Sequence, residues 1–524
     1  MTILTQDPPG SVDTAINYGT AWQEIDITND GLTAYKKVGG HAGTTLVPDL
    51  ATSLPTPTDG GMTYRFNVRS NVRYSDGTTF KPSDYVHVFE RMFKANGPAT
   101  GPFYSNIVGG PACLATPAAC SLAQGIVADD SAHTVTFHLL SADPEFFDKL
   151  ALPFAFAVPP TAPDTDAGNN PLPGTGPYRW AQYTPNSQIK LVRNPYFHQW
   201  SADSQPAGNP DTIIFKFGVP VESEVTEVEN GQADWVANTT GLPADRLSEL
   251  STSYASQIHV IPATAIYYMA LNTQVAPFNN LMARQAINYA TDRSALVKLF
   301  GGPKLATPSC QILPPNFPGY VQYCPYTANP VSDGHGPWSG PDLAKAKQLV
   351  QQSGTAGQTV TIVNPQIPLG QATGLYFQNL LNQIGYVGKL QVLAQAVQDP
   401  YAKNSKNKVQ MSLSIWFQDY QAPSDFLNVL TGCGSFQPNN GSQPNISEFC
   451  DQTAQNMMNA AETKEATDRN AANQLWAKVD QRVTDQAPMV VMYNPNNLDL
   501  VSKRVGNYQY NPQWGLLADQ TWVK

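Results

Sequence analysis

The first half of the chain alternates between the two-residue period of strands and the longer period of helices. Residues 62–68 alternate apolar and polar side chains, which predicts a half-buried strand. Pro82-Ser83-Asp84 is a helix start signal. The apolar residues that follow it share one helical face: Tyr85, Val88, Phe89, Met92 and Phe93. Further strands are predicted at 134–140, 187–192, 212–219 and 257–262, and a surface helix at 222–231.

The second half shows a more regular alternation of helices and strands. A run of strand-forming residues covers 266–273, and residues 282–300 predict one helix that Gly301-Gly302 closes. The elements expected after a proline-rich loop are helices at 342–352 and 374–384, strands at 359–363, 390–394 and 411–416, a long helix at 462–484 and a last strand that starts at 489–493. This order favours an α/β domain with its own sheet.

Composition and charge narrow the class of protein. The chain has 524 residues, of which 41% are hydrophobic and 14% charged, so we expect about three folded domains at roughly 150 residues each. The 41 acidic residues outnumber the 31 Lys and Arg, which argues against a nucleic-acid partner. No apolar run approaches the roughly 20 residues that span a bilayer. The first residues lack a basic and then apolar signal pattern, so we expect the signal segment to be absent from this chain.

The cysteines indicate an oxidising compartment. Six cysteines occur as three local pairs next to loop-forming residues, namely Cys113 and Cys120, Cys310 and Cys324, and Cys433 and Cys450. An even number in close pairs favours three nearest-neighbour disulfides over other pairings. Free thiols at some positions remain an alternative. Metal binding is disfavoured because no closely spaced Cys or Cys/His motif is present.

Motifs of catalysis are weak in this sequence. The seven histidines do not pair at metal-ligand spacing, and no Gly-x-Ser-x-Gly, Gly-x-Gly-x-x-Gly or phosphate-binding loop is present, so we predict no metal, no cofactor and no enzyme. Ser-x-x-Lys occurs at Ser187 to Lys190, inside a predicted strand, and at Ser405 to Lys408. A serine hydrolase that uses Ser405 and Lys408 remains the alternative from another class.

Several separated segments, in the correct order, resemble one family. These segments are residues 46–93, Gly174–Tyr178 with Arg193–Tyr196, Leu271–Thr273 with Ala283–Ala290, Leu313–Pro315 and Ile415–Tyr420. In them the chain is similar to bacterial extracellular solute-binding proteins of family 5, the oligopeptide-, dipeptide- and nickel-binding components of ABC importers.

The resemblance implies an α/β, two-lobed periplasmic-binding-protein-like fold of type II, cluster C, with three domains and a hinge that closes over a ligand. Domain I would comprise 1–46, 172–268 and 489–524, domain II 47–171 and domain III 269–488. The implied protein is a monomer at the cell surface or in the cell envelope, held as a membrane-anchored lipoprotein. It would deliver an oligopeptide to an ABC permease.

The resemblance also implies a binding site at the end of the strand at 411–416. Asp419 would hold the terminal ammonium of a peptide, Ile415 and Phe417 would pair with its backbone, and Trp416 would form an aromatic wall. The alternative for Asp419 is a cap of the turn before Pro423. Many peptide-binding members have Gly where Ile415 stands, so this chain departs from them there.

The distribution of arginine bears on the ligand. No arginine lies between Arg293 and Arg469, although most of domain III is there, so a fixed clamp on a ligand carboxylate is not expected in that domain. This disfavours a strict dipeptide binder and favours longer peptides or ligands without a carboxylate. An oligosaccharide or a peptide-like metabolite, held by aromatic stacking, is the alternative ligand; a nickel chelate has no histidine cluster to support it.

Overall fold

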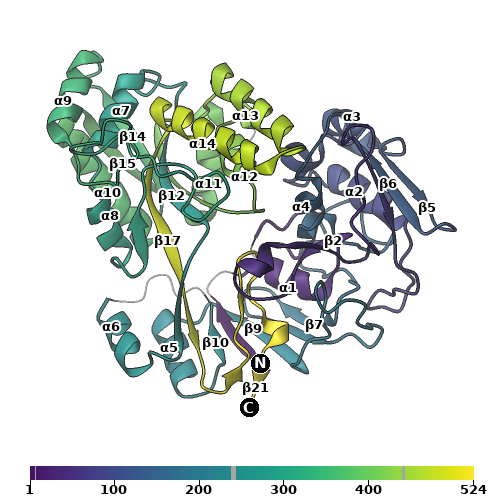
Figure 1. Ribbon diagram of the computed structural model, residues 1–524. Coiled ribbons are helices and arrows are strands. Elements are labelled where there is room, and N and C mark those ends of the chain that lie inside the picture. The colour runs from purple at the N-terminus through teal and green to yellow at the C-terminus, as the bar shows by residue number, and fades with distance from the viewer. Residues whose placement is uncertain (6–7, 20, 238–243, 439–442) are drawn as a thin grey trace. The chain divides into compact units, whose positions relative to one another are not determined.

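The computed structural model describes residues 1–524 except 6–7, 20, 238–243 and 439–442. The chain divides into two compact units (Figure 1). Unit 1 consists of Met1–Leu242, Ser248–His259 and Leu498–Lys524, and unit 2 of Pro243–Leu247 and Val260–Asn497. The finer division into domains I, II and III stays a prediction.

The main sheet of unit 1 is built around the N-terminal strand. β1 (Thr2–Thr5) lies parallel to β9 (Thr212–Phe217) on one side and to β10 (Trp235–Val236) on the other. β8 (Gln188–Arg193) and β7 (Tyr178–Thr184) continue the sheet beyond β9. The residue pattern predicted β8 and β9 but not β1, because four residues are too few to establish an alternation.

A smaller antiparallel sheet in unit 1 confirms the predicted strand and helix near the N-terminus. β6 (Thr134–His138) pairs with β4 (Thr63–Asn67) and with β5 (Ile126–Asp129). The five apolar residues predicted on one face of α2 (Asp84–Lys94) are all buried. Among them, the Phe89 ring meets Phe137 of β6 with centroids 5.4 Å apart, so the helix packs on this sheet.

The other helices and strands of this part of the chain are short. They are α1 (Trp22–Thr28), β2 (Thr33–Tyr35), β3 (Leu46–Pro48), α3 (Gly110–Ala115), α4 (Phe146–Leu150), α5 (Val221–Glu229), α6 (Ala244–Ser253), β11 (Ile258–Pro262), β18 (Val505–Gly506), β19 (Tyr510–Asn511), β20 (Gly515–Leu516) and β21 (Trp522–Val523).

Unit 2 has its own mixed sheet, as the alternation of its elements predicts. The strand order is β15 (Val387–Leu393), β14 (Thr359–Pro365), β16 (Met411–Phe417), β12 (Ala265–Leu271) and β17 (Met489–Val501), with β13 (Ala306–Pro308) also on β17. β14 lies parallel to β15 and β16, and β16 lies antiparallel to β12. The end of β17 pairs with β10 in unit 1.

Helices cover both faces of this sheet, which gives unit 2 two apolar cores (Figure 1). Core A contains side chains of the sheet and of α7 (Leu281–Ala290), α8 (Arg293–Phe300), α9 (Leu343–Gln352) and α10 (Pro368–Ile384). Core B contains the opposite face with α12 (Pro423–Thr431), α13 (Gln452–Glu465) and α14 (Arg469–Gln486). Unit 2 also has the helix α11 (Gln395–Lys403).

Two long helices of the sequence analysis are each two helices, so those predictions were wrong. The helix expected at 282–300 is broken between α7 and α8, where Asp292 accepts the Ala295 amide at 3.0 Å. The helix expected at 462–484 is broken between α13 and α14, where Asp468 accepts the Ala471 amide at 3.0 Å. Asp is a preferred N-cap, and the apolar period that continues across both breaks concealed these caps.

The three predicted disulfides are confirmed: Cys113–Cys120, Cys310–Cys324 and Cys433–Cys450. Among the described residues no cysteine is free, so the alternative of free thiols was wrong.

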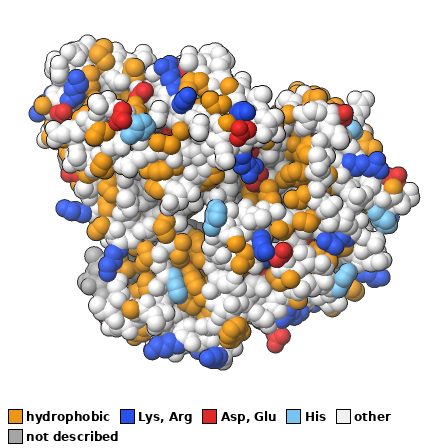
Figure 2. All heavy atoms as spheres, in the orientation of Figure 1, with side chains coloured by type: hydrophobic (Ala, Val, Ile, Leu, Met, Phe, Trp, Pro, Cys, Tyr) orange, Lys and Arg blue, Asp and Glu red, His pale blue; other side chains and the backbone are white. Residues whose placement is uncertain are grey.

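Charged side chains are sparse on the surface. Figure 2 shows Lys, Arg, Asp and Glu side chains singly or in small groups among uncharged ones on the face that it draws.

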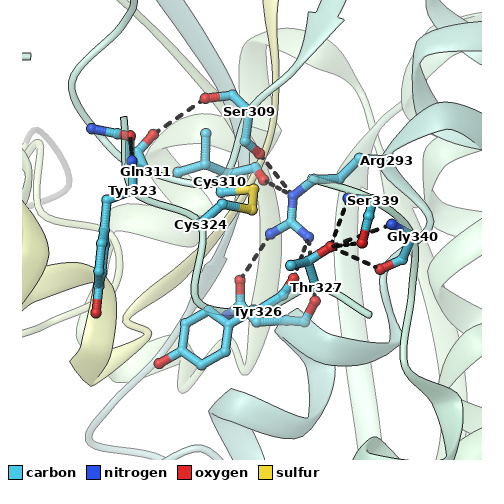
Figure 3. The surroundings of a disulfide bond; sticks show 12 residues. Arg293, Ser309, Cys310, Gln311, Tyr323, Cys324, Tyr326, Thr327, Ser339 and Gly340 are labelled. Carbon is cyan, nitrogen blue, oxygen red and sulfur yellow. Dashed lines mark hydrogen bonds between the residues drawn. A yellow bond between two sulfur atoms is a disulfide. The ribbon is translucent and has the colours of Figure 1, made fainter. Parts of the chain in front are cut away.

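The second disulfide joins two residues of the proline-rich loop after β13, and a buried arginine holds the backbone of this loop (Figure 3). Arg293 is fully buried, and its Nε donates to the carbonyl oxygens of Ser309 at 2.7 Å and Val491 at 2.9 Å. Its Nη1 points to the Tyr326 carbonyl at 3.5 Å. Burial lowers the pKa of the guanidinium to about 10, so it stays charged at neutral pH.

We expect Arg293→Met to lower the free energy of unfolding by at least about 2 kcal/mol, because it leaves buried carbonyl groups without a donor. The measurement is urea unfolding of the purified protein. The control is Lys298→Met on the same helix, where the side chain is exposed. Equal stability of the two variants would contradict the role given to Arg293.

Unit 1 buries several carboxylates around one lysine. The Lys37 ammonium donates to the Asp26 carboxylate, and both side chains are buried. The nearby Asp49 carboxylate, also buried, accepts the Trp200 indole N–H at 2.8 Å. Burial raises the pKa of Asp26 and that of Asp49 to about 6, although Lys37 works in the opposite direction at both.

The raised pKa of Asp49 predicts a pH dependence of stability. The folded state binds the proton of the Asp49 carboxyl group more tightly than the unfolded state, in which the pKa of this group is about 4. The resulting stabilisation is full below pH 4 and is lost as the pH rises through about 6. We therefore expect the Asp49→Asn variant to lose less stability than the parent between pH 4 and pH 6, measured by urea unfolding at each pH. The exposed Asp203→Asn variant is the control and should keep the parental slope.

Candidate functional site

β16 has a strand partner along its whole length on one side only. On that side every residue pairs with β12, from Met411↔Leu271 to Phe417↔Ala265. On the other side β14 reaches only Met411 and Ser412. β14 then continues beside β15 as far as Pro365↔Leu393. Within the described part of the chain, the last residues of β16 therefore have no strand beside them on the β14 side.

The backbone groups of Ile415 and Phe417 point to that side. At the two ends of the pairing with β12, the Gln418 amide donates to the Thr264 carbonyl and the Asn272 amide to the Gln410 carbonyl, both at 3.0 Å. Because the direction of these groups alternates along an antiparallel strand, the even-numbered residues bond to β12 and the odd-numbered ones face away. We call the outward N–H and C=O groups of Ile415 and Phe417 the open edge.

A buried asparagine marks where the open edge begins. The Leu413 amide, which also points away from β12, donates to Asn364 Oδ1 at 3.0 Å. Asn364 is fully buried, and its Nδ2 donates to the Gly370 carbonyl at 2.9 Å. Asn364 thus takes the place of a strand partner at Leu413. The next outward groups of β16 are those of Ile415.

The side chains at the end of β16 lie on two different faces of the sheet. Ile415 and Phe417 are 39% and 45% exposed and follow Met411 and Leu413 on the face of core A. Trp416 points to the opposite face, where it packs against core B. Its indole Nε1 is buried and has no hydrogen-bond partner among the described residues. The strand therefore ends in an aliphatic and an aromatic side chain exposed on one face, with an indole on the other.

Asp419 follows the strand in a turn that α12 holds in place. Its side chain is buried, with a relative exposure of 5%. Its backbone N–H donates to Asp425 Oδ2 at 2.9 Å. The N-cap of α12 is Ala422, which makes no side-chain capping bond. The Asp425 carboxylate thus ties the backbone of Asp419 to the first turn of α12.

Asn364 and Asp425 were not among the predicted site residues. A signal for Asp425 was present, because Pro423-Ser424-Asp425 repeats the tripeptide that starts α2 at Pro82. No local signal was present for Asn364, because its role depends on the pairing of β14 and β16. All four predicted site residues lie together at the end of β16, and their roles toward a ligand stay predictions.

Ser405 and Lys408, the alternative catalytic pair, lie in a short turn before β16. Ser405 begins a short 3-10 turn, in which the Lys408 amide donates to the Ser405 carbonyl at 3.1 Å. The Ser405 hydroxyl lies 3.5 Å from Gln443 Nε2, and the Lys408 side chain is exposed. An exposed ammonium is not desolvated as the lysine base of a serine hydrolase has to be, which weighs against this alternative.

The described residues contain no group of three or more His, Cys, Asp and Glu side chains suited to a metal ion. None of their helices combines the length and the apolar character needed to cross a bilayer.

The family model for bacterial extracellular solute-binding proteins, family 5 Middle, matches residues 45–438. This match covers most of the chain, so the protein belongs to that family. Its members bind solutes and are not enzymes, which confirms the prediction of a protein without catalytic activity.

The similar proteins include peptide-binding proteins. The chain is 24% identical over 503 residues to di/tripeptide-binding protein 1 of Pseudomonas aeruginosa, covering 90% of this chain and 85% of that protein. It is 26% identical over 475 residues to the periplasmic oligopeptide-binding protein OppA of Escherichia coli, covering 85% and 79%.

A solved structure confirms the fold. The clavulanic acid biosynthesis oligopeptide binding protein 2 superposes with a TM-score of 0.87 at 23% identity, over 100% of this chain and 95% of that one. The predicted class, an α/β periplasmic-binding-protein-like fold of type II, is therefore confirmed.

The hydrogen bond between Asp425 and the Asp419 amide gives a prediction about stability. We expect Asp425→Ala to lower the free energy of unfolding by about 1 to 3 kcal/mol, because the buried amide loses its acceptor. Asp399→Ala is the control: this carboxylate is half exposed in an ion pair with Lys403 at 2.7 Å and should contribute less than about 1 kcal/mol. Chemical unfolding of both variants measures the difference, and similar losses would contradict the assignment.

Proposed function

We propose that this protein is the extracellular substrate-binding component of an ABC importer, and that it captures oligopeptides and releases them unaltered. The observation that carries the proposal is the open edge of Ile415 and Phe417, directly followed by the carboxylate of Asp419. The peptide-binding relatives of the same family support it.

An extended peptide satisfies the open edge without any particular sequence. Its backbone N–H and C=O groups pair with those of Ile415 and Phe417 as an added strand would. Main-chain bonds supply affinity that is independent of the peptide's side chains. A dissociation constant in the micromolar range, about −8 kcal/mol, would suffice for capture and still allow release.

In this proposal Asp419 fixes the register of the peptide by accepting its terminal ammonium. An ionised carboxylate has two oxygens with about four acceptor positions, so it can hold an ammonium while it takes part in other bonds. A charge-assisted bond of this kind is about twice as strong as a neutral one. Trp416, whose ring lies beside the strand, would form one wall of the site.

The ligand we propose is longer than a dipeptide. No arginine occurs from residue 294 to residue 468, which includes the open edge and most of unit 2. A bidentate clamp on the ligand carboxylate therefore has no arginine in that stretch to form it. A longer peptide can leave its far end to water or to lysine.

The wider setting follows from the same proposal. The site would lie in domain III (269–488), and the lobe formed by domains I and II would close over the peptide through a hinge. The protein would act as a monomer, anchored outside the membrane as a lipoprotein, and would deliver its ligand to an ABC permease.

Replacing Asp419 tests the proposed contact with the ammonium. We expect Asp419→Asn to weaken the binding of a five-residue peptide by about 2 to 5 kcal/mol, because the ammonium would be buried without its counter-charge. Titration calorimetry measures the change. Acetylation of the peptide's N-terminus should weaken binding to the parent protein by a similar amount and have little effect on the variant.

The control is Asp164→Asn, which removes a half-exposed carboxylate from a surface ion pair with Lys94 in unit 1. It should leave affinity unchanged. Unchanged affinity in Asp419→Asn would exclude this residue from the site. Native mass spectrometry of the purified protein decides between the ligand classes, because a co-purifying oligosaccharide or metabolite without an amine would overturn the peptide proposal.

A further inference from the structure

The two exposed side chains at the end of β16 can discriminate between ligand side chains, which backbone pairing alone cannot do. Ile415 and Phe417 are large, apolar, and exposed on the same face of one strand. A side chain of this kind is common singly on a protein surface, but here the two are neighbours beside an unpaired backbone edge.

We infer that the site prefers peptides with apolar side chains at two ligand positions that have one residue between them. These two side chains pack against Ile415 and Phe417. This inference rests on the proposed function, because it requires a peptide strand on the open edge. Backbone pairing alone does not depend on the peptide sequence. The inferred contacts add a preference for apolar side chains at every second ligand residue.

Strand geometry determines which ligand side chains meet these residues. With its ammonium at Asp419, the peptide runs antiparallel to β16. Residues directly opposite each other in such a pair have side chains on the same face, with Cβ atoms about 5 Å apart. The ligand residues opposite Phe417 and Ile415 therefore both project over the apolar face, and the residue between them projects to the side of Trp416.

The two faces differ in what they accept. A charged or strongly polar side chain placed against Ile415 and Phe417 would lose water and gain no hydrogen bond from those two side chains. On the other face the strand presents the half-buried Ser414 hydroxyl and the Trp416 ring. Polar side chains are tolerated there, so the preference applies to alternate ligand residues and not to all of them.

Two peptides of identical composition test the inference. Leu-Ser-Leu-Ser-Ala and Ser-Leu-Ser-Leu-Ala have free termini and differ only in the phase of their leucines. Because two leucines move between an apolar face and a more polar one, we expect affinities that differ by about tenfold or more in titration calorimetry with the parent protein. Affinities equal within about twofold would overturn the inference, although binding itself would still support the proposed function.

Substitutions connect the preference to the two residues. Ile415→Ser combined with Phe417→Ser should reduce the phase preference to less than about threefold, mainly by weakening the tighter peptide. The control is Leu375→Ser combined with Val387→Ser, an exposed apolar pair elsewhere in unit 2, which should keep the preference. A preference that persists in the Ile415/Phe417 variant would show that these residues do not cause it. If neither peptide nor pentaalanine binds the parent protein, the proposed function itself is contradicted.

Discussion

The site depends on the point where β14 separates from β16, and one buried side chain makes this separation possible. A strand that loses its neighbour inside a sheet leaves an amide without an acceptor, which is costly where water is excluded. Asn364 supplies that acceptor to Leu413 and satisfies its own amide on Gly370. Because the pairing ends without an unsatisfied group there, the following backbone of β16 is available to another chain.

The chemistry of the site follows from this geometry and from the low charge of the protein. In the proposed site, backbone groups of β16 would pair with any extended peptide, and the carboxylate of Asp419 would distinguish one end of the peptide from the other. With 14% charged residues and no arginine in the stretch that holds the site, little else in this part of the chain favours a particular ionic side chain. Under the proposal, selection would therefore depend on shape and on apolar contact, which the exposed side chains of Ile415 and Phe417 could supply.

Local patterns predicted much of this structure, and the failures have physical causes. Residue patterns predicted β12, β14, β15, β16 and β17 of unit 2 and helix α2, but not the three-residue strand β13, and cysteine spacing predicted the disulfides. The breaks at Asp292 and Asp468 were missed because the apolar face of a helix can continue through an N-cap. The open edge was not predictable from residues 411–417 alone, because it depends on how β12 and β14, distant in the sequence, pair with β16.

The central position of β1 determines the order in which unit 1 can be completed. β1 lies more than 200 residues before its neighbour β9, which ends at Phe217, and β10 in turn pairs with Val501 at the end of β17. Loop closure over such distances is slow compared with local pairing. The sheet of unit 1 therefore stays incomplete until the segment around Val501 has been synthesised, and the edge of β10 is unpaired on that side until then.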